Sequence, residues 1–329
     1  MLYQDAFLQR LEAGLRDNLP KWGLPASASL RLLTISENAT YLAEDEAKGR
    51  RIVFRVHRPD YHSEAEIVSE LAWVQALRAE SVVETPRGIP AAGGDLLCAF
   101  SDSGVRRYVV AFEFMSGKEP DASDDLVKWY WKLGGINARL HRHSRGWRRP
   151  AGFARKLWDF DTIIGAAPHW GDWREGPGLT EDGRAVLEKT EAVLRRQTDA
   201  LDKGAGNFGL VHCDMRPANL LVDGDRLAVI DFDDCGLSWF GYDFAASVSF
   251  LEHEPYLGDL MKAWVDGYRT VAPLSAQEEA ALPIFVMLRR MQLTAWIASH
   301  SETPTAQSMG VPYTQGTVAL AERHLARYA

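Results

Sequence analysis

HCDMRPANLLVDGDRLAVIDFD, residues 212–233, is the stretch of this sequence that decides its fold and its chemistry. It contains a His-x-Asp-x4-Asn run, and an acidic tripeptide begins twelve residues after Asn219. A phosphoryl-transfer site needs these groups in this order. We expect Asp214 to orient a substrate hydroxyl and accept its proton, and Asn219 and Asp231 to hold magnesium on the phosphates.

Short apolar runs on either side of this motif predict how its parts meet. Residues 208–211 form a strand that leads into the loop, and residues 220–222 and 227–230 form a hairpin around Asp223-Gly224-Asp225. The hairpin would bring Asn219 close to Asp231. A single Asp or Asn is usually a turn or cap residue, but here the residues occur in order and at the right spacing.

On these residues the chain resembles the aminoglycoside phosphotransferase and choline kinase superfamily, whose fold is protein-kinase-like. Arg216 takes the place of a lysine in the protein-kinase loop, whereas small-molecule members often carry a histidine there. Residues 230–246 (IDFDDCGLSWFGYDFAA) look closest to the bacterial homoserine kinase type II and stress-response kinase group. The resemblance implies an α+β, bilobal fold, with a small antiparallel β lobe and a larger, mainly helical lobe.

Hydrophobic periodicity along the chain agrees with two lobes. The first part predicts strands at 29–35, 39–44, 50–56, 95–100 and 107–114, with helices at 3–19 and 63–79. The second part predicts helices at 124–143, 180–201, 241–252, 256–270, 276–299 and 316–328. We therefore expect a nucleotide-binding lobe at 1–114 and a catalytic, substrate-binding helical lobe at 115–329.

The resemblance also implies specific roles for the other residues of the catalytic region. Arg216 provides a fixed cation near the transferring phosphate, so we count it with Asp214 as catalytic. Asp233 is either a further metal ligand or a hydrogen-bond partner. His212 is expected to brace the acidic tripeptide, and Asp243 to accept hydrogen bonds from the backbone of the catalytic loop.

In the first lobe, a cation held by a helical carboxylate should bind the α- and β-phosphates. The strand at 50–56 contains no lysine and offers Arg55, for which an outward-facing role is the alternative. Its partner is Glu66 or Glu70, which share one helix face. Because Ser63-x-x-Glu66 forms a capping box, Glu66 is already engaged, and Glu70 is the better partner.

Two further segments are expected to contact the nucleotide. The turn between the first two strands, with Ser36 and Asn38, should cover the phosphates, although it lacks the glycines of protein kinases. Adenine should bind the lobe connection through backbone groups of Glu113 and Met115.

The acceptor side is less determined by the sequence. One interpretation of five residues in this region is an aromatic and acidic pocket for an amine: Trp158, Asp161, Trp170, Asp172 and Trp173. For the three tryptophans, packing in the core is the favoured interpretation. Arg289, Trp296 and His300 lie near one face of a single helix, where core packing is again favoured.

Composition excludes several classes of protein. The net charge of −8 argues against nucleic acid and acidic membranes as partners and is compatible with a cationic acceptor. No apolar run approaches the ~20 residues that cross a bilayer. Three cysteines without a Cys-x-x-Cys motif indicate a reducing cytoplasm and no structural metal, and a redox role for Cys213 and Cys235 is disfavoured.

Three functions remain in order of preference. The first is an ATP- and Mg²⁺-dependent kinase of a hydroxyl on a small molecule, such as an amino alcohol, amino acid or aminoglycoside. The second is a stress-response type Ser/Thr protein kinase, although twelve residues from Asp231 to Asp243 leave no room for a long activation segment. The third is a nucleotide-binding regulator without turnover. The sequence leaves the acceptor, the choice of ATP or GTP and the oligomeric state open.

Overall fold

The computed structural model of the chain describes residues 5–35, 38–121 and 123–328. The chain folds into two compact units. Unit 1 comprises Met1–Ser81, Thr85–Ser116 and Arg149–Ala154, and unit 2 comprises Val82–Glu84, Gly117–Arg148 and Arg155–Ala329. Together they confirm the expected α+β fold with an antiparallel sheet and many helices.

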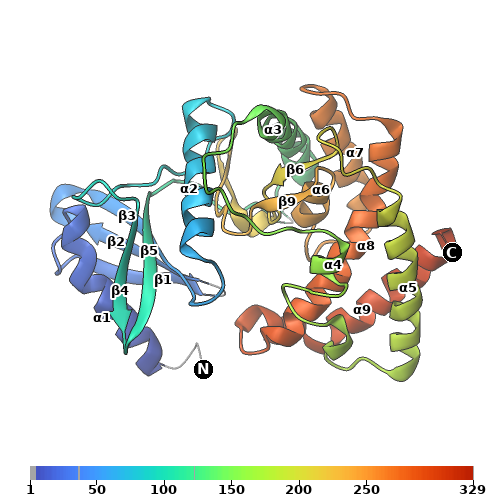
Figure 1. Cartoon of the computed structure of the whole chain (residues 1–329), viewed down its shortest axis with the longest axis horizontal. Helices are drawn as coiled ribbons and strands as arrows, with labels where there is room; N and C mark the ends of the chain where they lie inside the picture. The colour runs from blue at the N-terminus through green and yellow to red at the C-terminus, as the bar shows by residue number, and fades with distance from the viewer. Residues whose placement is uncertain (1–4, 36–37, 122, 329) are drawn as a thin grey trace. The chain divides into compact units, whose positions relative to one another are not determined.

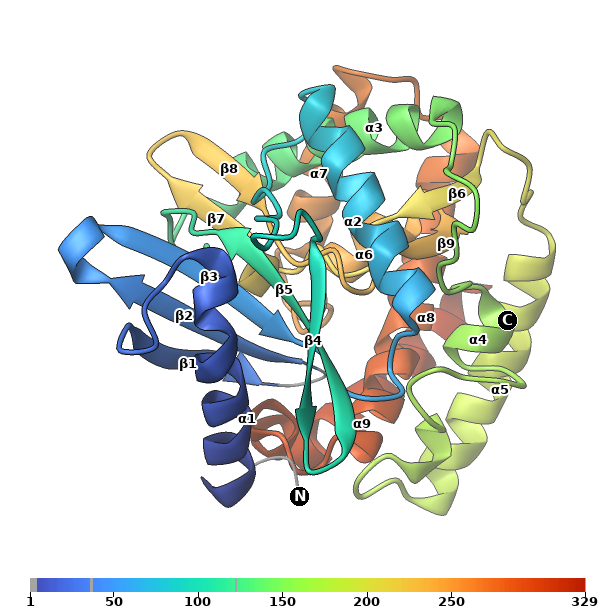
Figure 2. The ribbon, with the colours of Figure 1, turned by 60° about the vertical axis from the view of Figure 1, so that its left-hand side comes forward.

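Unit 1 is built on one antiparallel sheet of five strands in the order β1-β2-β3-β5-β4 (Figures 1 and 2). The strands are β1 (Ser29–Ile35), β2 (Ala39–Asp45), β3 (Arg50–Val56), β4 (Leu97–Asp102) and β5 (Val105–Glu113). Its two α-helices are α1 (Asp5–Asn18) and α2 (Glu64–Ala79).

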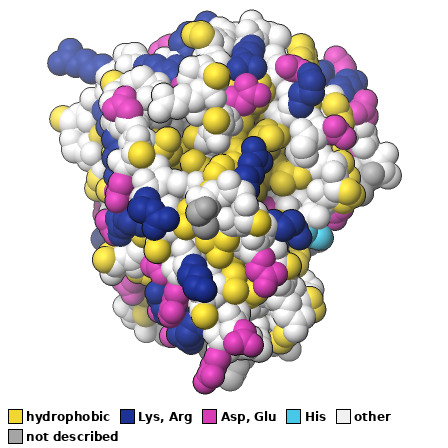
Figure 3. Space-filling view, turned by 90° about the vertical axis from the view of Figure 1, so that its right-hand side faces the viewer, with side chains coloured by type: hydrophobic (Ala, Val, Ile, Leu, Met, Phe, Trp, Pro, Cys, Tyr) yellow, Lys and Arg dark blue, Asp and Glu magenta, His cyan; other side chains and the backbone are white. Residues whose placement is uncertain are grey.

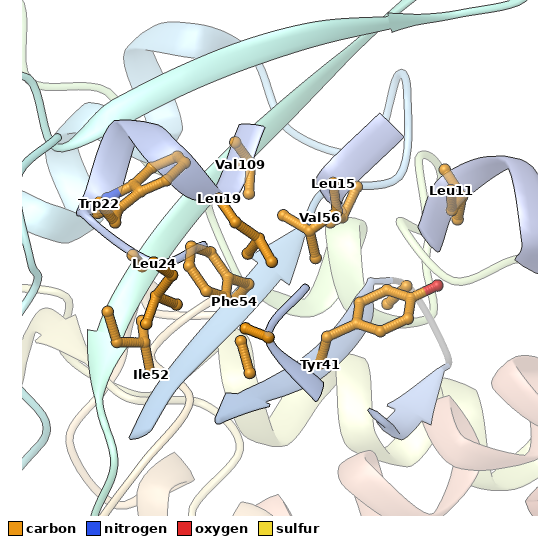
Figure 4. Close-up of a cluster of buried hydrophobic side chains, with 14 of the residues drawn as sticks. Leu11, Leu15, Leu19, Trp22, Leu24, Tyr41, Ile52, Phe54, Val56 and Val109 are labelled. Carbon is orange, nitrogen blue, oxygen red and sulfur yellow. The ribbon is translucent and has the colours of Figure 1, made fainter. Parts of the chain in front are cut away.

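Alternation along β3 assigns its side chains to two faces of the sheet. Ile52, Phe54 and Val56 are buried with the leucines of α1 and the 3-10 turn that follows it (Figure 4). Residues of a strand alternate between faces, so Val53 and Arg55 lie on the opposite side. There Val53 packs in a second cluster that includes Ile67 and Leu71 of α2.

Unit 2 contains two short antiparallel ladders and most of the helices. The strands are β6 (Phe208–Val211), β7 (Leu220–Asp223), β8 (Arg226–Val229) and β9 (Gly236–Trp239). The helices are α3 (Leu126–Gly146), α4 (Phe160–Ile163), α5 (Glu181–Asp199), α6 (Tyr242–Ser247), α7 (Leu257–Arg269), α8 (Ala276–Ser299) and α9 (Pro304–Tyr328).

The backbones of α3 and α7 approach closely at two glycines. A Cβ on Gly134 would meet the carbonyl oxygen of Trp264, and one on Gly267 would meet that of Trp131, well inside van der Waals contact. No side chain could be added at either position without separating the helices. Since α3 and α7 carry residues that support the catalytic loop, this close approach helps to set the site.

Several elements differ from the expectation. β9 was not expected; it is a strand because it pairs with β6. α9 begins at Pro304 rather than near residue 316, and it is broken at Gly310, which has φ 44°. Pro312 is tolerated there because it falls in the first turn after the break. Helix α6 ends at Ser247, five residues before the expected end.

The described residues include no helix that is both long enough and apolar enough to span a bilayer. On the face drawn in Figure 3, basic and acidic side chains are interspersed with hydrophobic ones.

Candidate active site

The catalytic loop begins where β6 ends, and a single buried carboxylate holds its backbone. Asp243, on α6, accepts the N–H of Cys213 at 2.8 Å and that of His212 at 3.3 Å. Cys213 has φ 68°, a conformation that non-glycine residues rarely adopt and that surrounding contacts must stabilise. The expected hydrogen bonds from the loop backbone to Asp243 are confirmed.

Two side chains of α3 fix Asp243 in turn. His141 Nε2 lies 3.0 Å and Asn137 Nδ2 lies 3.1 Å from its Oδ2 atom. Burial lowers the pKa of His141, so the ring is neutral; it donates from Nε2 to Asp243 and accepts at Nδ1 from the Tyr268 hydroxyl. Burial works to raise the pKa of Asp243, but the bonds from His141 and the loop backbone outweigh it and lower the pKa.

Asp214, the expected base, is held on both carboxylate oxygens. Arg289 Nη2 donates to Oδ1 at 2.6 Å. Asn219 Nδ2 donates to Oδ2 at 2.8 Å, and Arg216 Nε lies 3.4 Å from the same oxygen. The structure therefore brings Asp214, Arg216 and Asn219 together.

The hairpin places Asn219 and Asp231 at the same end of β7 and β8. Leu220 pairs with Val229, and the ladder continues as the N–H of Ile230 donates to the carbonyl of Asn219 at 2.9 Å. Asp231, the next residue, has φ 59° and so turns out of the strand.

His212 braces this segment as expected. Its Nε2 lies 3.2 Å from the carbonyl of Ile230, and its ring contacts Phe232 at a centroid distance of 4.4 Å. Burial lowers the pKa of His212, so the neutral ring donates from Nε2 and accepts the N–H of Asp214 at Nδ1.

The acidic segment after Asp231 is fixed through its backbone. Arg155 donates to the carbonyl of Asp233 and, at 2.5 Å, to that of Cys235. Trp158 Nε1 donates to the carbonyl of Asp234 at 3.0 Å. The Asp233 side chain is buried, beside residues that these bonds hold in place.

In unit 1 the expected pair is present. Arg55 Nη2 donates to Glu70 Oε2 at 2.5 Å, and both side chains are buried. Glu66 accepts the N–H of Ser63 at 2.8 Å, which completes the capping box. The choice of Glu70 over Glu66 as the partner is confirmed, and the outward-facing alternative for Arg55 is wrong.

The structure describes three of the four other residues that were expected to contact the nucleotide. Ser36 lies outside the described residues. Asn38 Oδ1 accepts the N–H of Arg58 at 3.1 Å. The N–H of Glu113 donates to the carbonyl of Arg87 at 2.9 Å, so this group is not available to adenine. A contact through the carbonyl of Glu113 or the backbone of Met115, two residues beyond β5, stays a prediction.

The residues between 158 and 173 follow the favoured interpretation, a packed core, and not the alternative of an amine pocket. Trp158, Trp170 and Trp173 are buried core, as the favoured interpretation held. The two acids are paired elsewhere, Asp161 with Arg195 and Asp172 with Arg174.

Arg289 is the site residue that sequence reasoning missed, because core packing was expected for it. It is almost fully buried, with 2% of its surface exposed. Its Nε donates to Ser249 Oγ at 3.0 Å and its Nη1 to Gln292 Oε1 at 3.2 Å, in addition to the bond to Asp214. A charged residue inside an apolar helix needs a partner, and this need was the signal in the sequence that could have marked Arg289. The sequence does not indicate that the partner is Asp214.

The thiols of Cys213 and Cys235 are both buried. Burial, with Asp243 nearby, raises the pKa of the Cys213 thiol well above its usual value. A protonated, buried thiol is a poor nucleophile, which agrees with the disfavoured redox role.

A carboxylate held beside a loop, with an amide and a second carboxylate at one hairpin end, is the arrangement that a kinase-type phosphotransferase needs. Residues 30–274 match the phosphotransferase enzyme family (APH), and the chain belongs to this family. It is a kinase of small molecules.

Among solved structures, the microcompartment-associated aminopropanol kinase is 43% identical, with a TM-score of 0.88 over 95% of this chain and 97% of that one. Amicoumacin kinase hAmiN, in complex with AMP-PNP, Ca²⁺ and Ami, has a TM-score of 0.74 over 96% of both chains but only 19% identity, and it shows the fold alone. The amicoumacin kinase of Bacillus subtilis is 22% identical over 80% of this chain and 77% of its own length.

Proposed function

We propose that this kinase transfers the γ-phosphoryl group of ATP, with Mg²⁺, to the hydroxyl of a small amino alcohol. The aminopropanol kinase, 43% identical over 97% of its length, supports this class of acceptor. The net charge of −8 is compatible with a cationic acceptor. The complex of amicoumacin kinase with AMP-PNP and Ca²⁺ supports the use of a nucleotide and a divalent cation.

The placement of Asp214 carries the proposal. Arg289 and Asn219 fix its two oxygens, while 14% of the side chain stays exposed. A carboxylate oxygen has two acceptor positions, so capacity remains for a substrate hydroxyl. Asp214 would orient that hydroxyl and take its proton, and Arg216, beside it, would place positive charge near the transferring group.

The residues present fit a magnesium ion. Asn219 uses its Nδ2 to bond Asp214, which leaves its Oδ1 for a cation next to Asp231. No group of three or more His, Cys, Asp or Glu side chains in the described part of the chain forms a metal cage. Mg²⁺ usually binds one or two protein oxygens plus phosphates and water, so Asn219 and Asp231 suffice, with Asp233 as a further candidate. When bound, the ion would neutralise charge on the phosphates.

Unit 1 is proposed to bind the nucleotide. Arg55 presents a planar guanidinium that can bond two phosphate oxygens, and Glu70 holds it. The remaining candidates are Ser36, Asn38, the carbonyl of Glu113 and the backbone of Met115. The proposed lobes are therefore 1–114 for the nucleotide and 115–329 for catalysis and acceptor binding.

A small acceptor is favoured over a protein. The segment between Asp231 and Asp243 is short, and β9 within it is paired with β6 along its full length. No long activation segment of the protein-kinase type fits between these residues.

A transfer assay tests the proposal. With ATP and Mg²⁺ we expect phosphorylation of 1-amino-2-propanol, and a much lower kcat/KM for 1,2-propanediol, which lacks the amine. Homoserine, an aminoglycoside and casein complete the panel. Equal turnover of 1-amino-2-propanol and 1,2-propanediol would refute amine recognition, and transfer to casein alone would favour a protein kinase.

The catalytic assignment is tested with Asp214→Asn, which keeps the shape of the side chain. We expect kcat to fall by about 10²- to 10⁴-fold, the usual contribution of a general base. Asp223→Asn, at the exposed far end of the same hairpin, is the matched control and should keep normal activity. Normal turnover by Asp214→Asn would remove Asp214 from the mechanism.

A further inference from the structure

The segment of residues 155–158 runs beside β9, and both belong to unit 2. Leu157 forms a parallel bridge with Leu237 of β9. The N–H of Leu237 donates to the carbonyl of Lys156 at 2.9 Å, and the N–H of Trp158 donates to the carbonyl of Leu237 at 2.8 Å. Backbone bonds on both sides of the bridge therefore hold this segment against β9.

Side chains of the segment hold three consecutive carbonyl groups of the acidic stretch that precedes β9. Arg155 donates to the carbonyl of Asp233 and, at 2.5 Å, to that of Cys235. Trp158 Nε1 donates to the carbonyl of Asp234 at 3.0 Å. A planar guanidinium can bond two oxygens at once in a fixed orientation. All three bonds end on backbone oxygens, so they occupy no carboxylate oxygen that a metal ion would need.

Asp231, the first proposed metal ligand of this stretch, has a backbone that needs support from both sides. Its φ of 59° is unusual for a residue other than glycine, and it persists only where surrounding contacts fix it. On the N-terminal side, His212 Nε2 lies 3.2 Å from the carbonyl of Ile230. On the C-terminal side, the bonds from Arg155 fix the chain from Asp233 onward. Release of either side would let the Asp231 carboxylate turn away.

Gly236 allows the segment to approach this closely. A Cβ atom at this position would lie 2.5 Å from the indole ring of Trp158 and 2.6 Å from the carbonyl oxygen of Lys156, well inside van der Waals contact. The φ of Gly236 lies outside the left-handed region, so the close approach, and not the backbone conformation, requires glycine. The residue at this position therefore suits the contact independently of the bonds from Arg155.

We propose that Arg155 is a positioning residue for the magnesium ion. By holding the residues after Asp231, it keeps that carboxylate in place for the ion that binds with the nucleotide. This role rests on the proposed function, because it requires Asp231 to be a metal ligand. Replacement of a residue that orients metal ligands usually lowers metal affinity or activity about 10- to 100-fold.

Calorimetry with AMP-PNP on the full chain tests this role without turnover. The ratio of two Kd values, in EDTA and in saturating Mg²⁺, measures how strongly the metal contributes to nucleotide binding. We expect this ratio to be about 10-fold lower in Arg155→Met than in the wild type, with an unchanged Kd in EDTA. An unchanged ratio would overturn the proposal. This includes the case in which both Kd values rise together, because that pattern indicates a general loss of structure.

Arg269→Met is the matched control for this variant. Arg269 Nη2 also donates to a backbone carbonyl, that of Leu274, at 3.0 Å, but in the turn between α7 and α8. Loss of this bond should leave the ratio at its wild-type value. An equal fall in the ratio for both arginines would overturn a specific role for Arg155.

A second pair of variants leaves Arg155 in place and moves the segment that carries it. Gly236→Ala puts a methyl group against residues 155–158, so the ratio should fall as it does in Arg155→Met. Gly258→Ala, whose Cβ would meet nothing within 4 Å, should leave the ratio unchanged. A wild-type ratio in Gly236→Ala would overturn the dependence on this segment.

This proposal and the proposed function can fail separately. If the wild type bound AMP-PNP equally well in EDTA and in Mg²⁺, the metal assignment would be wrong and this proposal with it. If no acceptor were found in the transfer assay, only the proposed function would be refuted, because these titrations need no acceptor.

Discussion

Two buried pairs of arginine and carboxylate, one in each unit, have nearly the same geometry and very different origins. Arg55 and Glu70 are 2.5 Å apart and 15 residues apart in sequence. Arg289 and Asp214 are 2.6 Å apart and 75 residues apart. Strand alternation, helix periodicity and a capping box predict the first pair, whereas the second forms only once the whole of unit 2 has folded. Local rules can thus identify a partner on the next element, but not one on a distant helix.

The pairs also differ in what they leave open to water. The Glu70 side chain is 1% exposed, whereas that of Asp214 is 14% exposed. A closed pair can only position Arg55, while the Asp214 pair leaves part of a carboxylate for chemistry. Mutation of each pair can therefore separate a positioning role from a catalytic one.

Among the variants that separate the two pairs, replacement of Arg289 should have the largest effect. Arg289→Met removes the donor that fixes Asp214 Oδ1, and we expect kcat to fall about 100-fold, because small misplacement of a catalytic group costs that much. Arg290→Met is the matched control: its guanidinium is equally buried but pairs with Glu252 at 2.8 Å. Both variants should lose stability in thermal unfolding, and only Arg289→Met should lose kcat per folded molecule. Equal kcat values would contradict a role for Arg289 in positioning Asp214.

Breaking the other pair should act on the nucleotide instead. Glu70→Gln removes the carboxylate charge that lies against the buried Arg55, so we expect about 3 kcal/mol of destabilisation and about a 10-fold higher KM for ATP. Glu66→Gln, four residues earlier on the same helix, should leave this KM unchanged. If Glu66→Gln raised the KM as much, the choice of partner from the capping box would be wrong.

The regular helices and strands could be predicted closely from the sequence, because the patterns that indicate them are local. The strands at 29–35 and 50–56 were predicted at their observed bounds, since alternation fixes both the strand and the face of Arg55. The link from Asn219 to Asp231 followed from the turn chemistry of the hairpin. In each case, the residues that decide the outcome lie within twelve positions of one another.

The parts that escaped prediction depend on distant contacts. β9 is a strand only because β6 lies beside it. Arg289 faces Asp214 because α8 runs past the catalytic loop, and no spacing in residues 276–299 encodes this. The break in α9 needs φ 44° at Gly310, which glycine permits but does not require.

Acidification should affect unit 2 through histidines that burial keeps neutral. The pKa values of His141 and His212 are lowered, and that of His324 is lowered to about 4 by burial. Unfolding exposes these rings, which then bind protons below about pH 6.5, so stability is full above that pH and falls below it. Each ring contributes at most about 1.4 kcal/mol per pH unit.

Urea unfolding between pH 7.5 and 5 measures this slope. We expect a decline that begins near pH 6.5, and a shallower one in His324→Gln. His253→Gln, whose side chain is 56% exposed, should keep the wild-type slope. Constant stability across this range would show that these rings are not held neutral in the folded protein.

The smallest expected effect comes from the Ser63 cap at the start of α2, on which the assignment of Glu70 to Arg55 depends. Ser63→Ala removes the side chain that accepts the N–H of Glu66, and loss of such a cap costs about 1 kcal/mol. Because Arg55 is held by Glu70, the KM for ATP should stay unchanged while the melting temperature falls slightly. A changed KM would mean that the start of α2, and not only the contact at Glu70, positions Arg55. The pair in unit 1 would then depend on its surroundings as strongly as the pair at Asp214 does.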